Sequence, residues 1–428
     1  MLTLFNYLVL SGIFAGGFVL FSTPFTFYVN YGFMFSFLVM WLFSGHKLYL
    51  NKHFLLFLVV FFVLALFNVF LKNNTFPTLF KQVSGFIFNG TAYYVLIKAN
   101  KGDISKLFKI YLKLAVIAAV IGIFQEISFL ADFADGYDYS YFIPNFRLGG
   151  TVLGILRVSS VLPEPAHFGG AMAPAIFISV LNIMKNEANF ISRKISFVII
   201  VSALLTFSLI TYVGSILALI LIVGNYRRIK LIITSLSVLL ALAIFSYKYV
   251  SEIRIRVDDT YAVVTGNAVL IESNLSTFAF LSNAAVAVRS FKNNPLFGSG
   301  IGSHSVSYDR YIFEVIDSEQ DTMILNKEDA GSLFFRLMSE TGLLGILGFL
   351  YFIKRFYVSR KRDQRLWIVS NSIACLFLIN LIRLGNFFYC GFMFFVWAYY
   401  FANKNATALH SIPQSEQIDN TTFAKGIL

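Results

Sequence analysis

Long runs of apolar residues are the feature of this sequence that most limits what it can fold into. Runs of roughly 17 to 22 residues recur along the chain, and a helix of that length crosses about 30 Å of hydrocarbon. The 428-residue chain is 57% hydrophobic and only 13% charged. A soluble protein of this length could not bury so much apolar surface. The sequence therefore predicts an all-α polytopic membrane protein.

Twelve membrane-spanning helices are expected from these runs. The first run follows no basic segment and has no small-residue cleavage site, so we expect an uncleaved span rather than a signal peptide. The seventh and eighth spans adjoin, and the β-branched residues and glycine of Thr211–Gly214 predict a tight turn between them. The expected spans are residues 2–22, 25–44, 53–71, 79–98, 106–129, 166–184, 195–210, 214–224, 231–247, 332–353, 366–382 and 385–402.

The distribution of Lys and Arg supports this number and predicts an orientation. With both termini in the cytoplasm, most of the 34 basic residues fall on the cytoplasmic side, and most of the 22 acidic residues fall on the other. Merging the seventh and eighth spans would move the basic clusters at 227–230 and 354–365 outside, against the positive-inside rule. The net charge of +12 is therefore an orientation signal, and it does not indicate a nucleic-acid partner.

Two outer segments are too long to be simple turns. We expect no separate soluble domain, and both cysteines, Cys375 and Cys390, are expected to be packed thiols inside apolar runs. The polar C-terminal tail is expected to be disordered and cytoplasmic. The expected divisions are residues 1–129 (five helices), 130–165 (first outer loop), 166–247 (four helices), 248–331 (larger outer loop, partly helical), 332–402 (three helices) and 403–428 (tail).

The first outer loop interleaves aromatic residues with carboxylates. Aromatic rings stack on the C–H faces of sugars, and carboxylates accept hydrogen bonds from hydroxyl groups, so this composition suits a carbohydrate. The alternative is an interfacial aromatic belt, which is a general feature of membrane proteins. The candidate glycan-binding residues are Asp135, Tyr137, Asp138, Tyr139 and Tyr141.

Two titratable residues lie beside prolines at the outer end of the sixth span. Pro163 and Pro165 prevent a regular helix through Glu164, and a helix is expected to begin near Ala166. Glu164 is then either a capping acid that benefits from the helix dipole or a partly desolvated general base. His167 is either an interfacial histidine satisfied by a backbone carbonyl or a proton acceptor.

The second outer loop contains a helical segment and a glycine-rich segment. Residues 282–292 predict a helix with Ser282 as its N-cap and a stop at residues 293–295. Glycines at alternate positions follow in residues 298–302, and such glycines allow backbone N–H groups to approach an anion closely, as in a phosphate-binding nest. Their spacing is not that of a dinucleotide-binding fingerprint.

An acidic segment follows the glycines. Asp317, Glu319, Asp321 and Glu328 have the spacing of a calcium loop, but Thr322 stands where the turn requires glycine, so an EF-hand is excluded. A solvated acidic surface is favoured over a loose divalent-cation site. The sequence therefore predicts neither a metal site nor another cofactor.

Arg336 and Glu340 are four residues apart in the first turns of the tenth span. Charges inside a membrane span are costly, so this pair is a functional-site candidate. The structural alternative is a salt bridge between neighbouring turns of one helix.

Four short segments of the chain together form a known pattern. They are residues 164–168 (EPAHF), residues 206–208 (TFS), Arg289 with residues 294–302 (NPLFGSGIG), and residues 340–345 (ETGLLG). Leu209 stands where an arginine often follows the second segment. In this order and placement, the segments resemble the Wzy-type O-antigen polymerase family, in the wider O-antigen ligase-like superfamily. The resemblance covers most of the chain, and the expected topology agrees with it.

The resemblance implies a glycosyltransferase at the periplasmic face of the bacterial inner membrane. Such an enzyme transfers a growing glycan from undecaprenyl pyrophosphate onto a lipid-linked oligosaccharide repeat unit. Its partners are these lipid-linked oligosaccharides, membrane lipids and a chain-length regulator protein. A base removes a proton from the acceptor hydroxyl, and cations stabilise the departing pyrophosphate. Arginines suit the second role because their planar fork matches phosphate oxygens.

Each candidate residue has a role under this interpretation. Glu164 is the first choice for the base and His167 the second, while Arg336 and Glu340 hold the site together. The expected pyrophosphate clamp consists of Arg157, Arg289, Arg254 and Arg256, with His304 beside it as a further catalytic candidate. The hypothesis predicts that alanine at Glu164, Arg157 or Arg289 abolishes long glycan chains.

The nearest alternative is an O-antigen ligase, which transfers glycan to lipid A core. Ligases tend to carry a histidine-rich patch before the late Glu-x-Gly element, whereas this chain has residues 326–332 (NKEDAGS) there, which favours a polymerase. A flippase or other transporter is less favoured, because the sequence has no inverted repeat and its charges cluster at the outer face. A structural scaffold would not need titratable residues at that boundary.

Overall fold

The structure of this chain is a computed structural model. It describes residues 1–21, 26–48, 50–187, 190–226, 247–316 and 324–410, together with residues 237, 240, 241 and 244. The α-helices are α1 (Leu2–Ser11), α2 (Val29–Phe43), α3 (Lys52–Phe70), α4 (Phe76–Ala99), α5 (Ile104–Leu130), α6 (Pro165–Lys185), α7 (Arg193–Leu204), α8 (Leu209–Tyr226), α10 (Ser251–Val264), α11 (Leu275–Asn293), α12 (His304–Ile316), α13 (Leu333–Arg355), α14 (Gln364–Ile382) and α15 (Phe392–His410).

The remaining regular structure is short. Two antiparallel hairpins join β1 (Val19–Phe21) to β2 (Phe27–Tyr28) and β3 (Thr151–Val152) to β4 (Ile155–Leu156). The 3₁₀ helices are η1 (Ala134–Gly136), η2 (Leu270–Glu272) and η3 (Tyr389–Gly391).

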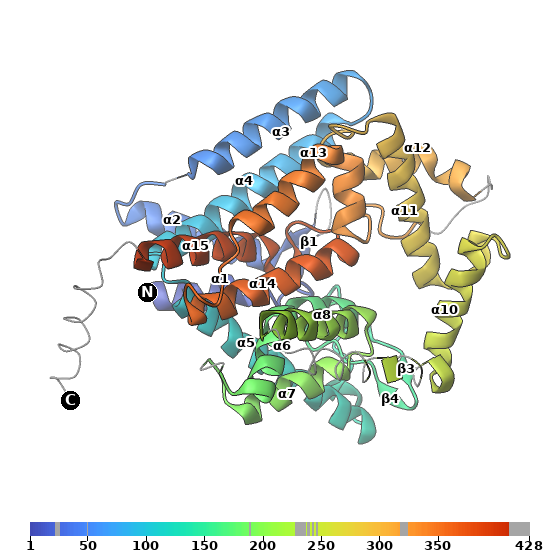
Figure 1. Cartoon of the computed structure of the whole chain (residues 1–428), viewed down its shortest axis with the longest axis horizontal. Coiled ribbons are helices and arrows are strands. Elements are labelled where there is room, and N and C mark those ends of the chain that lie inside the picture. The colour runs from blue at the N-terminus through green and yellow to red at the C-terminus, as the bar shows by residue number, and fades with distance from the viewer. Residues whose placement is uncertain are drawn as a thin grey trace.

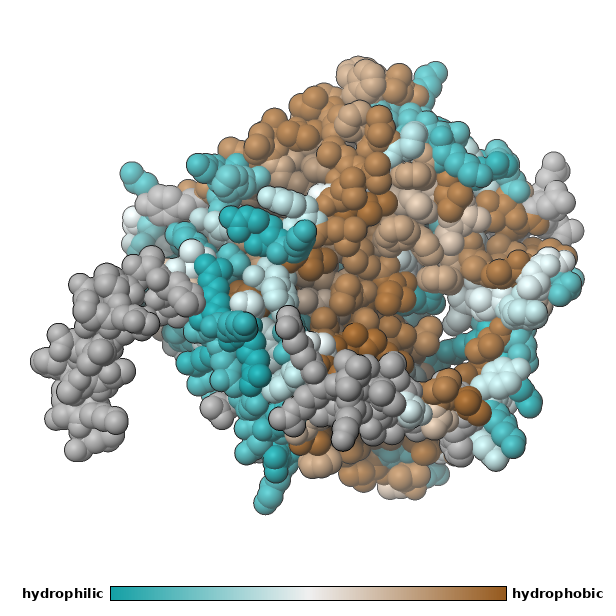
Figure 2. Space-filling view, in the orientation of Figure 1, coloured by the Kyte–Doolittle hydropathy of each residue, from teal (hydrophilic) through white to brown (hydrophobic). Residues whose placement is uncertain are grey.

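The helices have the length and composition of membrane spans. Among the described helices, α3, α5, α6, α8, α13 and α14 are long and apolar enough to cross a membrane, and α1 and α2 are shorter apolar helices. Figure 2 shows a broad hydrophobic area across the middle of the molecule, with hydrophilic residues on either side. Both cysteines are buried and free, as expected. The chain is thus an all-α membrane protein, whereas the number of twelve crossings stays a prediction.

The first expected span is wrong in its extent. α1 is only ten residues long, and the chain then continues through turns into β1, so residues 2–22 do not form one helix. Glycines explain this irregular path, because a Cβ atom at Gly16 would lie 2.3 Å from the Tyr389 hydroxyl oxygen and one at Gly17 would lie 2.6 Å from Ile143. At Gly16 and Gly17 the non-helical backbone is therefore packed closely against other parts of the chain.

α7 and α8 are separate helices, as expected, but the break between them is not where the sequence predicts it. The chain turns at residues 205–208, whereas Thr211–Gly214 lies inside α8. Phe207 has a positive φ of 43°, and the hydroxyl groups of Thr206 and Thr211 hydrogen-bond across the turn at 2.8 Å. The TFS segment is therefore the turn itself.

Two expectations concern parts of the chain near the limits of the described residues. The expected ninth span, 231–247, lies mostly outside them. The expectation of a disordered tail is wrong for residues 403–410, since α15 continues to His410 and the amide of Asn403 donates to the carbonyl oxygen of Tyr357 at 3.1 Å. Residues 411–428 lie outside the described residues.

Both long loops gather at one end of the helix bundle. Figure 1 shows α10, α11, α12 and the β3–β4 hairpin on the right of the view, on the opposite side from the N-terminus. The larger loop is partly helical, as expected. However, α11 begins at Leu275 rather than Ser282, because the Asn274 side chain accepts hydrogen bonds from two backbone N–H groups of the first turn. The helix stops at Asn293, as predicted.

Candidate functional site

Glu164 lies at the N-cap of α6, directly before Pro165. Proline at the first helical position fixes φ for the helix, so the carboxylate is held at the helix mouth. Glu164 occupies the N-cap position, but its side chain makes no capping hydrogen bond. Instead, its Oε1 accepts a hydrogen bond of 3.1 Å from Nη1 of Arg147, in the first long loop. The two side chains are 40% and 73% exposed, so this is an ion pair at the surface.

His167, in the first turn of α6, lines a small cavity of about 130 Å³. Its ring nitrogen Nδ1 is buried and has no hydrogen-bond partner, and the same is true of the hydroxyl oxygen of Tyr389. The two rings are packed together with centroids 4.6 Å apart. Buried polar atoms are normally hydrogen-bonded, so two exceptions at one polar cavity indicate room for a polar ligand. The lining residues are Tyr28, Asn145, His167, Asp329, Asn380, Leu384, Asn386, Tyr389 and Cys390.

The cavity wall joins segments that are far apart in the sequence. The Asp329 carboxylate accepts a hydrogen bond of 3.0 Å from the N–H of Gly331, whose carbonyl oxygen accepts one of 2.9 Å from the N–H of Leu384. A Cβ atom at Gly385 would lie 1.6 Å from the carbonyl oxygen of Asp329, so only glycine permits this approach. The segment before α13 is thereby fixed against the segment after α14.

Positive charges from several segments lie near the cavity. Arg147 is within electrostatic range of His167, and Arg383 is within electrostatic range of Asp329, both of which line the cavity. A Cβ atom at Gly149 would contact both Arg157 and the first residue of α6, so Arg157 packs beside the start of that helix. Arg383 is within electrostatic range of both Asp329 and Arg256. Of the four clamp arginines expected from the sequence, Arg157 lies beside the start of the helix that carries His167, and Arg256 is related to the cavity only through Arg383.

The other two expected clamp arginines have different surroundings. Arg289, on α11, forms an ion pair of 3.2 Å with Glu314 on α12, and both side chains are about half exposed. Arg254 is exposed on α10. Arg289 therefore joins two helices of the second long loop.

His304 is a buried structural histidine. Its Nδ1 lies 2.8 Å from the hydroxyl oxygen of Ser339, and its Nε2 lies 3.0 Å from the amide oxygen of Asn283. Burial, with a smaller contribution from Arg336, lowers the pKa of His304 to about 3. The neutral ring therefore links α11 to α13, and His304 is not among the residues that line the cavity.

Arg336 and Glu340 form the expected ion pair, with Nε 2.9 Å from Oε1 and side chains only 5% and 1% exposed. The guanidinium also donates to the carbonyl oxygen of Gly385 at 3.0 Å and to the amide oxygen of Gln82 at 2.8 Å. It lies over the Phe387 ring at 4.4 Å. Because residues 384–390 include much of the cavity wall, this pair fixes the wall against α4 and α13.

The glycine-rich segment packs against α13, and this argues against the expected anion-binding nest. Gly298, Gly300 and Gly302 have positive φ values of 65°, 95° and 83°. However, backbone N–H groups of this segment already donate to carbonyl oxygens of α13 at 2.9 and 2.8 Å. A Cβ atom at Gly298 would lie 2.4 Å from the carbonyl carbon of Glu340. The glycines therefore permit close backbone packing, and no N–H group of residues 299 and 300 is left for a phosphate.

α13 is interrupted where it meets this segment. Gly342 has φ 59° and ψ −151°, which breaks the helix. The N–H groups of Leu343 and Leu344 donate to the carbonyl oxygens of Pro295 and Leu296 at 2.9 and 3.0 Å. The NPLFGSGIG and ETGLLG segments thus pack backbone to backbone, and together they form a structural joint.

The glycan-binding candidates of the first long loop divide into two groups. Asp135 is exposed in η1, and Tyr141 is 90% exposed. Tyr137 and Tyr139 pack against neighbouring phenylalanine rings with centroids 5.3 and 5.6 Å apart, and Asp138 accepts a hydrogen bond from a nearby backbone N–H. Only Asp135 and Tyr141 therefore present freely accessible side chains.

The acidic run shows ion pairs rather than a cation site in its described part. Residues 317–323, with three acids of the rejected calcium loop, lie outside the described residues. Glu328 pairs with Lys81 at 2.9 Å, and Asp309 pairs with Lys327 at 2.6 Å. Within the described ranges, no group of three or more His, Cys, Asp or Glu side chains could hold a metal ion.

Most cavity residues were not predicted from the sequence. Asn380 and Asn386 lie in the apolar stretch 366–402, where polar residues are costly, and this signal could have singled them out. Asp329 was grouped with the acidic surface. Tyr389 has no local feature that distinguishes it from the other tyrosines, and only the fold places it beside the imidazole.

The arrangement brings three chemical abilities together. An unpartnered imidazole nitrogen can accept a proton, asparagine amides can orient hydroxyl groups, and arginines can neutralise an anion. No known protein-family model matches this chain, and no curated protein is significantly similar to it.

Proposed function

We propose that this chain is a polysaccharide (O-antigen) polymerase. It would move a growing glycan from undecaprenyl pyrophosphate onto a lipid-linked oligosaccharide repeat unit at the periplasmic face of the bacterial inner membrane. The observation that carries the proposal is the polar cavity where His167 and Tyr389 have buried, unpartnered polar atoms. Leaving such a group unpaired costs about 1–3 kcal/mol, and a bound sugar hydroxyl would remove that cost.

His167 is favoured over Glu164 as the base in this reaction. Glu164 is already paired with Arg147, whereas Nδ1 of His167 has no partner. The imidazole accepts the proton of the acceptor hydroxyl while the hydroxyl oxygen bonds to the anomeric carbon of the donor glycan. Glu164 and Asp329 are within electrostatic range of the ring, so their carboxylates stabilise the imidazolium that forms.

The arginines near the cavity suit the leaving group. The bond between the anomeric carbon and the pyrophosphate oxygen breaks, and the oxygen gains negative charge. Arg157 and Arg256 from the original clamp, with Arg383, supply the positive charges that stabilise it. The Asn145, Asn380 and Asn386 amides supply donors and acceptors for sugar hydroxyls.

One feature of the structure supports the alternative of a transporter, namely the break in α13 at Gly342. Broken helices line the substrate sites of many transporters. Here, however, the freed N–H groups of Leu343 and Leu344 donate to the chain's own carbonyl oxygens at Pro295 and Leu296. The break is filled by backbone, and this favours an enzyme over a transporter.

The deciding experiment is incubation of the purified full-length chain with a lipid-linked repeat unit. The proposal expects a ladder of products separated by one repeat. Cells that lack the protein distinguish the ligase, because loss of a polymerase leaves one repeat on the lipid A core and loss of a ligase leaves none. A thermal unfolding profile checks that the purified protein is folded. The absence of a ladder from folded protein would contradict the proposal.

A further inference from the structure

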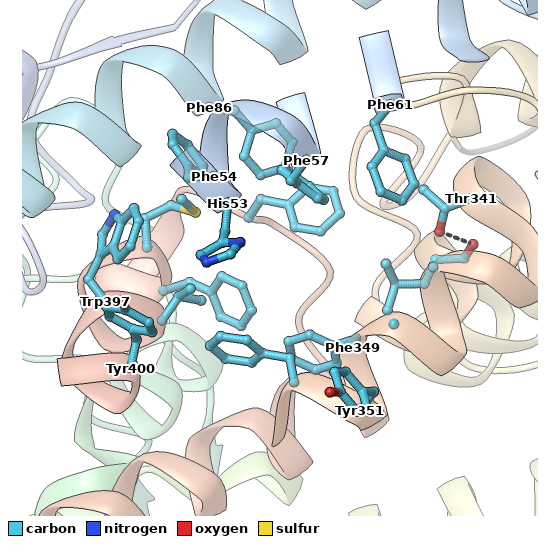
Figure 3. A pocket seen from close by; sticks show the side chains of 18 of the residues that line it. His53, Phe54, Phe57, Phe61, Phe86, Thr341, Phe349, Tyr351, Trp397 and Tyr400 are labelled. Atoms are coloured by element: carbon cyan, nitrogen blue, oxygen red, sulfur yellow. Dashed lines mark hydrogen bonds between the residues drawn. The ribbon is translucent and has the colours of Figure 1, made fainter. Parts of the chain in front are cut away.

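A second and larger cavity lies between α3, α4, α13 and α15, and the proposed reaction gives it no role. Its volume is about 770 Å³, within the range of roughly 300–1,000 Å³ that is typical of ligand pockets. Figure 3 shows aromatic side chains around it, among them Phe54, Phe57, Phe86 and Phe349. Such an apolar lining suits hydrocarbon and not sugar.

The cavity is an elongated groove along one face of α13. The residues of this helix that line it run from Leu333 through Leu337, Thr341 and Gly345 to Arg355. After the break at Gly342, the lining stretch from Gly345 to Arg355 is roughly 15 Å long at 1.5 Å per residue. The shape therefore matches an extended hydrocarbon chain that lies along the helix.

The two ends of the groove differ in charge. At the end near the start of α13, the groove is lined by Ile301, which is 2% exposed, and by Thr341, whose hydroxyl donates to the carbonyl oxygen of Leu337 at 2.8 Å (Figure 3). At the other end, Arg355 and His53 line the groove and are exposed. Among the residues that line the groove, Arg355 is the only arginine or lysine, and it lies at this end.

We propose that this groove binds an anionic phospholipid, with an acyl chain along α13 and the phosphate beside Arg355 and His53. Basic pockets between transmembrane helices are typical sites for anionic lipid head groups. The lipid-linked substrate of the proposed reaction would need its pyrophosphate near Arg157 and Arg256 instead. The inference is therefore independent of the proposed function.

Native mass spectrometry of the detergent-purified full-length chain tests the head-group contact. The protein is titrated with phosphatidylglycerol and, separately, with phosphatidylcholine. We expect tighter binding of phosphatidylglycerol, and about tenfold weaker binding after Arg355→Gln, the size of one lost charge-assisted hydrogen bond. Lys361→Gln is the matched control, because Lys361 is exposed and does not line the groove. It is expected to bind phosphatidylglycerol as the unaltered chain does.

A second variant tests the position of the acyl chain. Gly348 lines the groove, and a Cβ atom there would have no neighbour within 4 Å, so Gly348→Leu fills the groove without a clash. We expect loss of phosphatidylglycerol binding. Gly224→Leu is its control, because Gly224 also has open space, on α8 and away from the groove.

Three results would overturn the proposal. They are equal binding of the two phospholipids, unchanged binding after Gly348→Leu, and displacement of phosphatidylglycerol by an equal concentration of polyprenyl phosphate, which would make the groove a substrate site. Elution from size-exclusion chromatography checks folding. If Gly348→Leu is misfolded, unchanged binding by Arg355→Gln still contradicts the proposal.

Discussion

Two histidines of this chain have buried ring nitrogens, and their surroundings are opposite. His304 has a partner for each nitrogen, Ser339 for one and Asn283 for the other. His167 has an Nδ1 without a partner, at a cavity where the Tyr389 hydroxyl has none either. A fully hydrogen-bonded buried group holds a fold together, whereas an unsatisfied one is expected where function requires it. We therefore expect His304 to contribute to the stability of the fold and His167 to contribute to catalysis.

The largest expected effect is on catalysis by the His167→Ala variant. Loss of the base is expected to lower the rate of ladder formation by about 10²–10⁴-fold. The midpoint of thermal unfolding should change little, because the ring nitrogen has no hydrogen bond to lose. Initial rates and unfolding midpoints are measured on the same preparation. A variant that keeps more than a tenth of the rate would assign proton transfer to another group.

Breaking the buried ion pair is expected to have the next largest effect. Arg336→Met or Glu340→Leu alone leaves one uncompensated buried charge, which costs about 3–5 kcal/mol of unfolding free energy. The double variant removes both charges and is expected to lose less. Unfolding midpoints of the three variants decide this, and a double variant as unstable as the sum of the singles would show that the pair is not the cause.

His304→Ala should destabilise the fold and spare the reaction. Two hydrogen bonds from α11 and α13 lose their partner, so we expect a loss of about 1–3 kcal/mol. The ladder rate per folded molecule should stay within twofold. A large loss of rate with unchanged stability would show that His304 has a catalytic role and not a structural one.

The pH dependence of stability tests the burial of His304 independently. Its folded pKa of about 3 lies below the ordinary value of 6.5, so above pH 6.5 the ring is neutral in both states. Below pH 6.5, the unfolded chain binds a proton that the folded chain cannot, and unfolding free energy falls by about 1.4 kcal/mol per pH unit towards pH 3. The difference in stability between the unaltered chain and His304→Ala should therefore shrink from pH 7 to pH 5. A constant difference would place the ring in contact with water.

The smallest expected effect separates two arginines that the sequence treated alike. Arg289→Ala removes an exposed ion pair, worth about 0–1 kcal/mol, and should leave chain length unchanged. Arg157→Ala should shorten the glycan ladder, because Arg157 packs beside the start of α6. Gel profiles of the two variants, at equal protein level, are compared. Loss of long glycan chains in the Arg289→Ala variant would instead support the role in pyrophosphate binding that the sequence predicted for Arg289.

Sequence reasoning succeeded where the signal was local. The i and i+4 spacing predicted the Arg336–Glu340 pair, and Pro165 predicted the start of α6 to within a residue. It failed where the partner came from elsewhere in the chain. The glycines at 298–302 suggested an anion nest, but the N–H groups of Ser299 and Gly300 donate to carbonyl oxygens of α13. The apolar run at 2–22 suggested one helix, but other parts of the chain cover its irregular backbone.

The sequence by itself determined that this chain is a helical membrane protein, because apolar run length is a local property that only hydrocarbon can accommodate. Tertiary structure alone decided which polar atoms found partners. The ring nitrogens of His304 found Ser339 and Asn283, whereas the His167 ring packs against Tyr389 and its Nδ1 has no hydrogen-bond partner. Hydrogen-bond satisfaction depends on atoms brought together from distant segments, and no local pattern contains that information.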